Sequence, residues 1–347
     1  MRILEISRSG FFKALQPDST LWIRWGSPLT ADEPHRPEAF GSSTTASALL
    51  HICNKTYDLI VLPAIHPDHR FDQPLHKLIA KSMLRAFGRS PAFSRLLNRL
   101  LIGTNRHAII DVRDERNLCE TTIRLFPRNT LYFKRELDLD RTTDPQALDR
   151  VRPLSLFVPD ERCLLPPRGK DIDIFFAGAL CNSIRTDALD AAHSLAARGL
   201  RVVTPCTPLP YPEFMAALAR SWLVLSPEGY GWDCYRHYEA CLAGSVPVIN
   251  SPSYRRRLYL EDGVHCFYYD ADQGSLVDQL PALLVDKDRL LRMAEAGRRH
   301  ILANHTRSAV ANYMLKEIFG GGPAMADLLP RIPPADTSGR MKVPLNR

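Results

Sequence analysis

The segment from Trp222 to Asn250 limits the choice of fold more than any other, because two short apolar runs frame one helix-length stretch. The runs 222–225 and 246–249 are compact enough for buried parallel strands. Between them, apolar side chains recur at the spacing i, i+4, i+7 and i+8, Asp233 can cap a helix and Gly244 can end it. The segment therefore predicts a strand, a helix and a second parallel strand, which together form one unit of an α/β sheet.

The turn that enters this helix has a composition that suits an anion. Gly229 and Gly231 flank Tyr230, and glycine lets backbone amides approach a ligand without a Cβ in the way. Arg236 and Glu239 follow three residues apart, so they project together, with the arginine nearer the positive helix N-terminus. A diphosphate on Arg236 and ribose hydroxyls on Glu239 match that order. An ordinary ion pair on a surface helix is the alternative interpretation.

The run from Ser226 to Ile249 resembles the donor-binding segment of group 1-type glycosyltransferases with the GT-B fold. It shares with the spore-coat-type and exostosin-like branch an Arg-x-x-Glu followed by small residues and a Pro-Val-Ile strand. The group 1 pattern separates two glutamates by seven residues, whereas ten residues separate Glu228 from Glu239 here. The resemblance therefore assigns donor-binding roles to Arg236 and Glu239 and leaves the role of Glu228 open. It extends over residues 170–318.

The resemblance implies an α/β fold with two Rossmann-like domains whose parallel sheets face a central cleft. We expect an N-terminal, acceptor-side domain at residues 1–160 and a nucleotide-sugar-binding domain at 161–320, with the boundary in a proline-rich run. In GT-B relatives the last helix, expected here over 306–319, crosses back to the first domain. The tail 321–347 is rich in proline, glycine and small residues, and we expect it to be flexible.

A second glycine turn is expected near the start of the C-terminal domain. The run 171–176 predicts a strand that leads into Gly178, and Arg185 falls in the first turn of a helix predicted over 184–197. This turn resembles the glycine-containing loop after the first strand of GT-B donor domains, where a basic residue reaches the donor phosphates. Arg185 is therefore the second candidate for phosphate binding, with helix N-terminal amides beside it. An exposed surface arginine is the alternative.

A polar loop follows the buried strand predicted over 58–63. It contains His66, Asp68 and His69, at the end of a parallel strand where ligands gather in open α/β sheets. His66 and Asp68 could deprotonate an acceptor hydroxyl in an inverting transfer, although a surface loop is the simpler interpretation. Metal binding by the histidines is the weakest one, because GT-B enzymes as a class need no catalytic metal. We therefore expect no metal and no cofactor besides the donor.

Charged residues also follow two further predicted strands, over 108–112 and 131–133. They are Asp111, Arg113, Asp114, Lys134 and Arg135. Because the carboxyl ends of parallel strands share one edge of a sheet, we expect these side chains to face the cleft.

The formal net charge of +7 suits an anionic ligand such as a nucleotide sugar. Nucleic acid is not an expected partner, because the basic residues are scattered and no zinc-finger spacing occurs. The basic amphipathic segment 75–102 predicts crossover helices with a solvated face, or alternatively a peripheral contact with an anionic membrane. The first residues are typical of a strand rather than of a signal peptide, and no apolar run could span a bilayer, so we expect a cytoplasmic protein.

The sequence thus predicts a metal-independent glycosyltransferase that moves a sugar from a nucleotide-sugar donor to a glycan, lipid-linked or small-molecule hydroxyl acceptor. A non-catalytic GT-B relative that binds nucleotides as a scaffold is one alternative. An NAD(P)-dependent oxidoreductase is a weaker one, because the third glycine of Gly-x-Gly-x-x-Gly is missing after Gly229 and Gly231.

Overall fold

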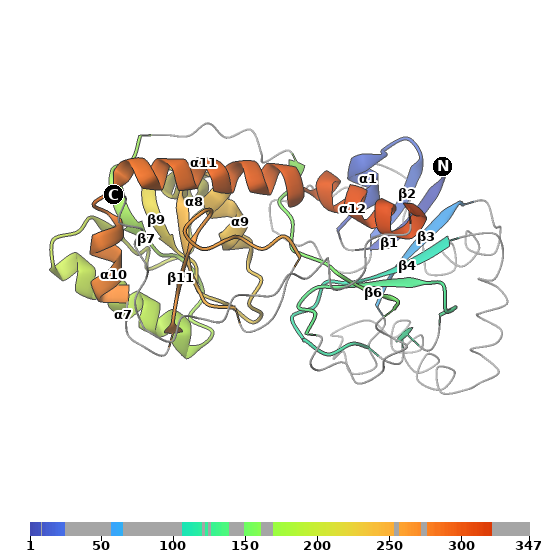
Figure 1. The fold of residues 1–347 in the computed structure, drawn as a ribbon, viewed down its shortest axis with the longest axis horizontal. Helices are drawn as coiled ribbons and strands as arrows, with labels where there is room; N and C mark the ends of the chain where they lie inside the picture. Colours follow the sequence, from blue (N-terminus) through green and yellow to red (C-terminus); the bar gives the residue numbers. More distant parts are fainter. Residues whose placement is uncertain are drawn as a thin grey trace, which may run out of the picture.

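The computed structural model describes residues 1–7, 9–24, 57–64, 106–119, 122–123, 126–138, 149–160, 169–252, 257–271 and 276–320. The His66 and Asp68 loop, the basic segment 75–102 and the tail 321–347 lie outside these residues. The described parts form two lobes, each built on a parallel sheet (Figure 1).

The N-terminal lobe contains a six-stranded parallel sheet with the strand order β2-β1-β3-β4-β5-β6. Its strands are β1 (Ile3–Ser7), β2 (Thr20–Arg24), β3 (Leu59–Pro63), β4 (Arg106–Asp111), β5 (Leu131–Lys134) and β6 (Val151–Pro153). The last strand ends at Pro153, although the largely apolar sequence continues through residues 154–158. The reason is that Leu156 and Val158 form hydrogen bonds with residues outside the sheet.

The C-terminal lobe contains a five-stranded parallel sheet with the order β11-β10-β9-β7-β8. Its strands are β7 (Ile172–Phe175), β8 (Val202–Val203), β9 (Ser221–Leu225), β10 (Val246–Asn250) and β11 (Phe267–Tyr269). Its helices are α7 (Ser183–Ala197), α8 (Tyr211–Arg220), α9 (Tyr235–Leu242), α10 (Leu276–Leu283) and α11 (Lys287–Asn304). The predicted strand-helix-strand unit is confirmed as β9, α9 and β10, and the two strands pair in parallel.

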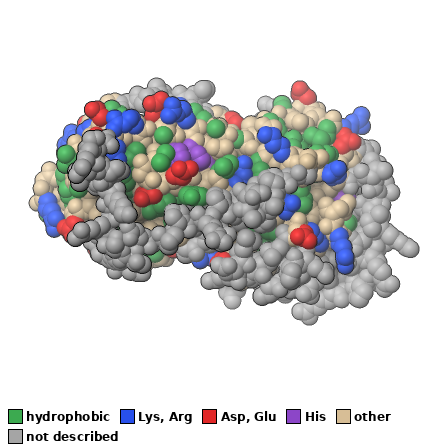
Figure 2. Space-filling model, in the orientation of Figure 1, with side chains coloured by type: hydrophobic (Ala, Val, Ile, Leu, Met, Phe, Trp, Pro, Cys, Tyr) green, Lys and Arg blue, Asp and Glu red, His purple; other side chains and the backbone are tan. Residues whose placement is uncertain are grey.

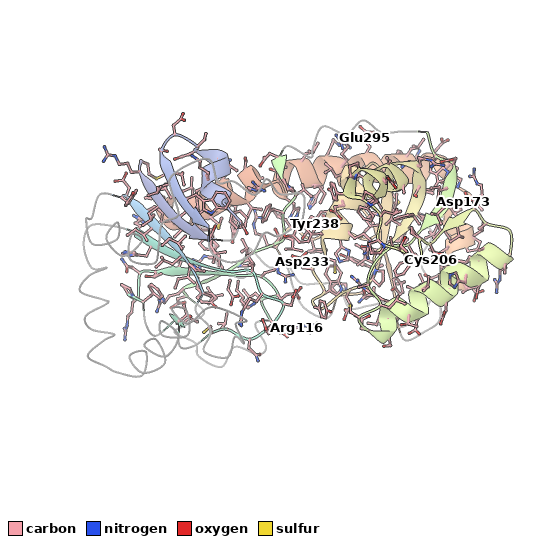
Figure 3. All side chains as sticks on the ribbon, turned by 180° about the vertical axis from the view of Figure 1, so that it is seen from behind. Arg116, Asp173, Cys206, Asp233, Tyr238 and Glu295 are labelled. Carbon is pink, nitrogen blue, oxygen red and sulfur yellow. The ribbon has the colours of Figure 1, made fainter. Side chains whose placement is uncertain are left out.

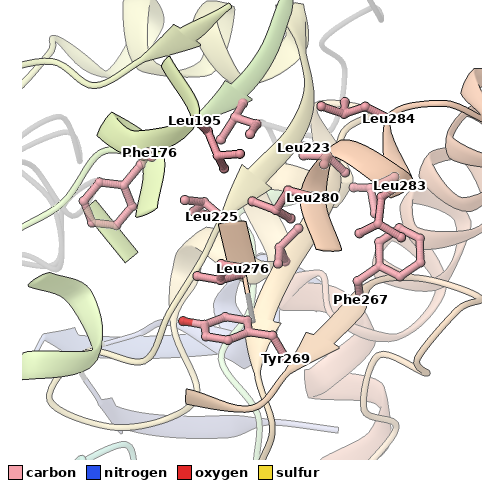
Figure 4. Close-up of a cluster of buried hydrophobic side chains, with 14 of the residues drawn as sticks. Phe176, Leu195, Leu223, Leu225, Phe267, Tyr269, Leu276, Leu280, Leu283 and Leu284 are labelled. Carbon is pink, nitrogen blue, oxygen red and sulfur yellow. The ribbon is translucent and has the colours of Figure 1, made fainter. Parts of the chain in front are cut away.

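Strand β9 is buried on both faces, because helices pack against each face of the sheet. Leu223 and Leu225 point to one face, where they pack with Phe267 and with Leu280 of α10 (Figure 4). Val224 points to the other face and packs with α8 and α9. A hydrophobic core therefore lies on each side of β9, the strand that precedes the Gly229 turn.

The last helix, α12 (Arg307–Gly320), leaves the C-terminal lobe and packs on the N-terminal one. Val310 and Met314 share a core with Ile3 and with Phe11 of α1 (Phe11–Leu15), and Figure 1 shows α12 beside α1 and β1. This is the crossing that the resemblance to GT-B relatives implies. The two connections between the lobes run side by side, since Val158 bonds to both His305 and Arg307 through the backbone.

Charges of both signs are spread over the visible described surface. Figure 2 shows lysine and arginine interspersed with acidic and apolar side chains on both lobes, so the positive charge forms no single band on this face. None of the helices in the described residues is both long and apolar enough to cross a bilayer.

Candidate diphosphate site at the entry to helix α9

Arg236 occupies the centre of the candidate site, in the first turn of α9. Its guanidinium lies against the loop that follows β7. A Cβ on Gly178 would collide with Nη2 of Arg236 and would lie 3.0 Å from its Cζ. Glycine at position 178 therefore leaves the room that the guanidinium occupies, which is a packing reason for a glycine in this turn.

The guanidinium of Arg236 is short of partners. Its Nε and Nη1 atoms are buried, and neither has a hydrogen-bond partner within the described part of the chain. Burial, together with the nearby charge of Arg185, lowers the pKa of Arg236 to about 10, and Glu239 opposes this shift. A buried cation beside a second cation is unfavourable by itself and becomes favourable when an anion binds to both.

Arg185, the second predicted phosphate ligand, is 8% exposed and is therefore not a surface arginine. Its Nε donates to the carbonyl of Glu228 at 2.8 Å and its Nη1 to the carbonyl of Ala179 at 2.9 Å. A Cβ on Gly229 would lie 2.8 Å from Nη2 of Arg185. The side chain thus links the loop after β7 to the loop after β9 and lies next to Arg236.

Asn182 joins the start of α7 to the same loop. Its Oδ1 accepts from the backbone N–H of Arg185 at 3.0 Å, which makes it the N-cap of the helix. Its Nδ2 donates to the carbonyl of Gly229 at 2.9 Å. One side chain therefore holds both the start of α7 and the turn 228–231, which we call the donor turn.

Glu228 lies at the C-terminal edge of the sheet, and Asn250 holds it there. The backbone N–H of Glu228 donates to Oδ1 of Asn250 at 2.8 Å, and Nδ2 of Asn250 donates to Oε2 of Glu228 at 2.7 Å. Sequence reasoning missed Asn250. Its position directly after the predicted strand 246–249 was the available signal.

The remaining predicted donor residues surround this centre. Glu239 is half-buried one turn further along α9, close enough to Arg236 to affect its pKa. Tyr230 is 86% exposed at the tip of the turn, which a backbone hydrogen bond of 2.9 Å from Gly229 to Gly231 closes. The site thus brings together Gly178, Arg185, Glu228, Gly229, Arg236 and Glu239 at the carboxyl edge of the C-terminal sheet.

Gly231 has a different role from the one the sequence indicated. A Cβ on this residue would lie 2.5 Å from Oε1 of Glu136 and 2.9 Å from Oδ1 of Asp114, both in the N-terminal lobe. The absence of a side chain therefore leaves room for two carboxylates of the other lobe.

The expected helix cap at Asp233 is wrong. Helix α9 has Cys234 at its N-cap position and no side-chain cap bond. The carboxylate of Asp233 instead accepts from the N–H of Leu156 at 2.7 Å and from the hydroxyl of Tyr238 at 2.5 Å. Figure 3 shows Asp233 and Tyr238 at the junction of the two lobes.

Two of the charged residues expected to face the cleft are buried inside the N-terminal lobe. Lys134 is fully buried and donates to the carbonyl of Arg113 at 3.1 Å, while Asp111 accepts from the hydroxyl of Tyr132 at 2.6 Å. Both side chains lie at the ends of their strands but below the protein surface, where Lys134 and Asp111 form an ion pair at 3.8 Å. Arg135 does reach the other lobe, because its Nη1 donates to the carbonyl of Asp233 at 2.9 Å.

Sequence comparison places a known family on this part of the chain. A profile of the RXYLT1 C-terminal domain matches residues 179–257, a range that includes the arginine pair and the Gly229 turn. Ribitol-5-phosphate xylosyltransferase 1 of Danio rerio is 54% identical to the chain over 37 residues. That match covers 11% of this chain and 8% of the length of the relative.

Solved structures share the fold over nearly the whole chain. An alpha-glucosyltransferase in complex with UDP and a 13-mer DNA has a TM-score of 0.60 and 13% identity, and the match covers 92% of this chain and 99% of that one. A glycosyltransferase from Rickettsia africae and HepE from Anabaena in complex with UDP have TM-scores of 0.54 and 0.53, at 10% and 13% identity and the same coverage. The fold is therefore GT-B, and the α/β prediction is confirmed.

Proposed function

We propose that this GT-B chain is a glycosyltransferase that binds a nucleotide sugar on its C-terminal lobe and transfers the sugar to a hydroxyl acceptor held by its N-terminal lobe. The observation that carries the proposal is that Nε and Nη1 of Arg236, beside Arg185, are buried and have no hydrogen-bond partner in the part of the chain that the structure describes. Both lie at the carboxyl edge of a parallel sheet, which is where ligands bind in open α/β folds.

The chemistry of transfer explains why fixed cations belong at this place. The bond between the anomeric carbon and a phosphate oxygen breaks, and negative charge develops on the departing nucleoside diphosphate. Arg236 and Arg185 would stabilise that charge without rearranging, since packing already holds both side chains. By comparison with other preorganised groups, one such arginine contributes about 2 to 4 kcal/mol to the transition state.

Glu239 has the position required for the ribose. It lies one turn beyond Arg236 on α9, and a carboxylate can accept hydrogen bonds from both ribose hydroxyls. The order along the helix then runs from diphosphate to ribose. Glu228 and Tyr230 belong to the same turn and complete the proposed donor site.

UDP is the first nucleotide to test, because two structural neighbours were solved with it. The identity of the sugar is left to experiment. Because the chain resembles a xylosyltransferase over a short segment, the UDP sugars to be tested include UDP-xylose. The arginine pair supports transfer without a metal ion, so the proposed activity should persist in EDTA. A glycan, a lipid-linked sugar and a small-molecule alcohol are the acceptor classes.

The proposal is tested by measuring UDP release from each UDP sugar, with and without acceptors, for the wild-type protein and for Arg236→Gln. We expect at least one sugar to be consumed by the wild type and a loss of about a hundredfold in the variant, the size seen when one preorganised donor is removed. Binding of UDP without turnover of any sugar would favour the scaffold alternative. Binding of NAD instead would favour the oxidoreductase.

A further inference from the structure

We infer that Arg135 and Glu136 of the N-terminal lobe are positioning residues for the diphosphate site of the C-terminal lobe, acting through the backbone of Asp233. The inference rests on the proposed function and goes beyond it. It states that one lobe sets the geometry of the other lobe's phosphate site, so that donor binding and contact between the lobes are coupled.

The contacts are made to backbone atoms. The N–H of Asp233 donates to Oε1 of Glu136 at 2.7 Å, and the carbonyl of Asp233 accepts from Nη1 of Arg135 at 2.9 Å. Both peptide groups of one residue are therefore fixed from across the lobe boundary. Arg236 follows three residues later, so the direction in which α9 begins, and with it the position of its guanidinium, depends on this residue.

The side chain of Asp233 adds two further ties. Its Oδ2 accepts from the backbone of Leu156, which connects the two lobes, and its Oδ1 accepts from Tyr238 on α9. Three N-terminal residues and one helix residue thus converge on Asp233, which is 4% exposed. Charge-assisted bonds of this kind are individually strong when they are buried.

Glu136 has a strained backbone that supports a specific role. Its φ is 56°, in the left-handed region that a residue with a Cβ seldom adopts. The side chain is buried, and its Oε1 lies where a Cβ of Gly231 would be only 2.5 Å away. In this conformation the carboxylate reaches the turn at Gly231 and the N–H of Asp233, and a side chain at position 231 would collide with it.

Neighbouring carboxylates favour the charged form of Arg135, the arginine that contacts Asp233 from the N-terminal lobe. Burial alone would lower the pKa of Arg135, but the carboxylates of Asp233, Asp114 and Glu136 raise it above its ordinary value. The donor turn consequently lies between acidic groups of one lobe and the Arg185 and Arg236 pair of the other. Because energetic coupling is reciprocal, an anion that draws the arginines together should also strengthen the contact between the lobes.

Pyrophosphate is the probe for a direct test, because it reports on the arginine pair without any assumption about base or sugar. We compare the wild type with Glu136→Ala, which removes the acceptor, and Glu136→Gln, which keeps an oxygen at that place. Glu317→Ala is the matched control, since Glu317 is also a buried carboxylate paired with an arginine, at 2.7 Å from Arg152, but lies on α12. All proteins are first checked for native folding by circular dichroism.

The expected result is a loss of about tenfold in pyrophosphate affinity for Glu136→Ala, equivalent to the removal of one hydrogen-bonded tie, with Glu136→Gln and Glu317→Ala within about threefold of the wild type. In an Arg236→Gln background, Glu136→Ala should change the residual affinity no further, because it acts through the arginine. Should Glu136→Ala not fold, Gly231→Ala serves as the second variant. Its Cβ would collide with the carboxylate of Glu136 and displace it, so we expect the same loss of pyrophosphate affinity.

Two failures can be told apart. A wild-type protein that binds neither pyrophosphate nor UDP contradicts the proposed function. A wild-type protein that binds pyrophosphate, together with a folded Glu136→Ala or Gly231→Ala that binds it equally well, overturns the inference and leaves the proposed function standing.

Discussion

The guanidinium groups of Arg185 and Arg236 lie side by side at the backbone of Gly178. A Cβ at this glycine would lie 3.0 Å from Cζ of Arg236 and 3.2 Å from Nη1 of Arg185. Arg185 donates from Nε and Nη1 to two carbonyls, whereas two nitrogens of Arg236 have no hydrogen-bond partner among the described residues. The pair is therefore unequal: Arg185 is held in place by the protein, and Arg236 retains its binding capacity for an anion.

Gly178→Ala should displace Arg236 without unfolding the protein. The added Cβ meets the end of a flexible side chain, which can move aside, and no backbone atom is among its three nearest contacts. We expect the affinity for pyrophosphate to fall about tenfold. The melting temperature should also fall somewhat, because the φ of Gly178, 158°, is one that a residue with a Cβ rarely adopts. Gly199→Ala is the control, because Gly199 also has a positive φ, 92°, and a Cβ there meets nothing within 4 Å. Equal affinities for the two variants would show that an anion does not need the guanidinium of Arg236 beside Gly178.

Asn182→Ala should weaken both α7 and the donor turn. Loss of an N-cap costs about 1 kcal/mol of stability, and the carbonyl of Gly229 also loses its donor. Asp286→Ala removes the matching cap of α11, where Oδ1 accepts from Arg289 at 2.8 Å, far from the turn in sequence. Urea unfolding should show similar losses for both variants, whereas only Asn182→Ala should bind pyrophosphate more weakly. A binding loss of the same size in Asp286→Ala would contradict a specific role for Asn182.

Lys134 should make the protein more stable as the solution becomes alkaline. Burial lowers its pKa to about 8, below the value of about 10.4 in an unfolded chain. Between these values the unfolded state binds more protons, so the free energy of unfolding rises with pH, by at most about 1.4 kcal/mol per pH unit for one group. Lys134→Met should reduce this slope between about pH 8 and 10. Lys170, whose pKa burial also lowers to about 8, remains in the variant. Identical slopes would show that Lys134 keeps its ordinary pKa.

Arg236→Met should stabilise the protein in the absence of ligand. The substitution removes a buried, partly unpaired cation from the neighbourhood of Arg185, and we expect the free energy of unfolding to rise by about 1 kcal/mol. Pyrophosphate at about a hundred times its wild-type dissociation constant should add about 2.7 kcal/mol to the wild type and at most about 0.4 kcal/mol to the variant. Urea unfolding with and without pyrophosphate measures both effects. Destabilisation of the ligand-free variant would indicate that Arg236 is a structural residue.

The sequence was sufficient for the regular elements of the C-terminal lobe. The runs 222–225 and 246–249 are apolar on both faces, so they predict buried strands without knowledge of their neighbours. Arg236 could be singled out because the glycine turn and the helix start lie within a few residues of it. Short-range patterns of this kind determine local structure and can be read from one sequence.

The contacts between the lobes could not be read in the same way. Glu136 and Asp233 are 97 positions apart, and nothing near either residue indicates the other. Aspartate is a residue type typical of helix caps. In the folded chain, however, the carboxylate of Asp233 accepts hydrogen bonds from Leu156 and Tyr238 instead of from the helix terminus. Gly231 was likewise expected to face a ligand and instead faces a carboxylate. Tertiary contacts overrode the local preference in both cases.

Isothermal titration of pyrophosphate into the wild-type protein and into Arg236→Met tests the proposed anion site most directly. Binding to the wild type, with a loss of at least about a hundredfold in the variant, is the predicted result, since a charge-assisted bidentate contact would be removed. Equal binding by the two proteins, or no binding by the wild type, would contradict the assignment of this helix terminus as a diphosphate site.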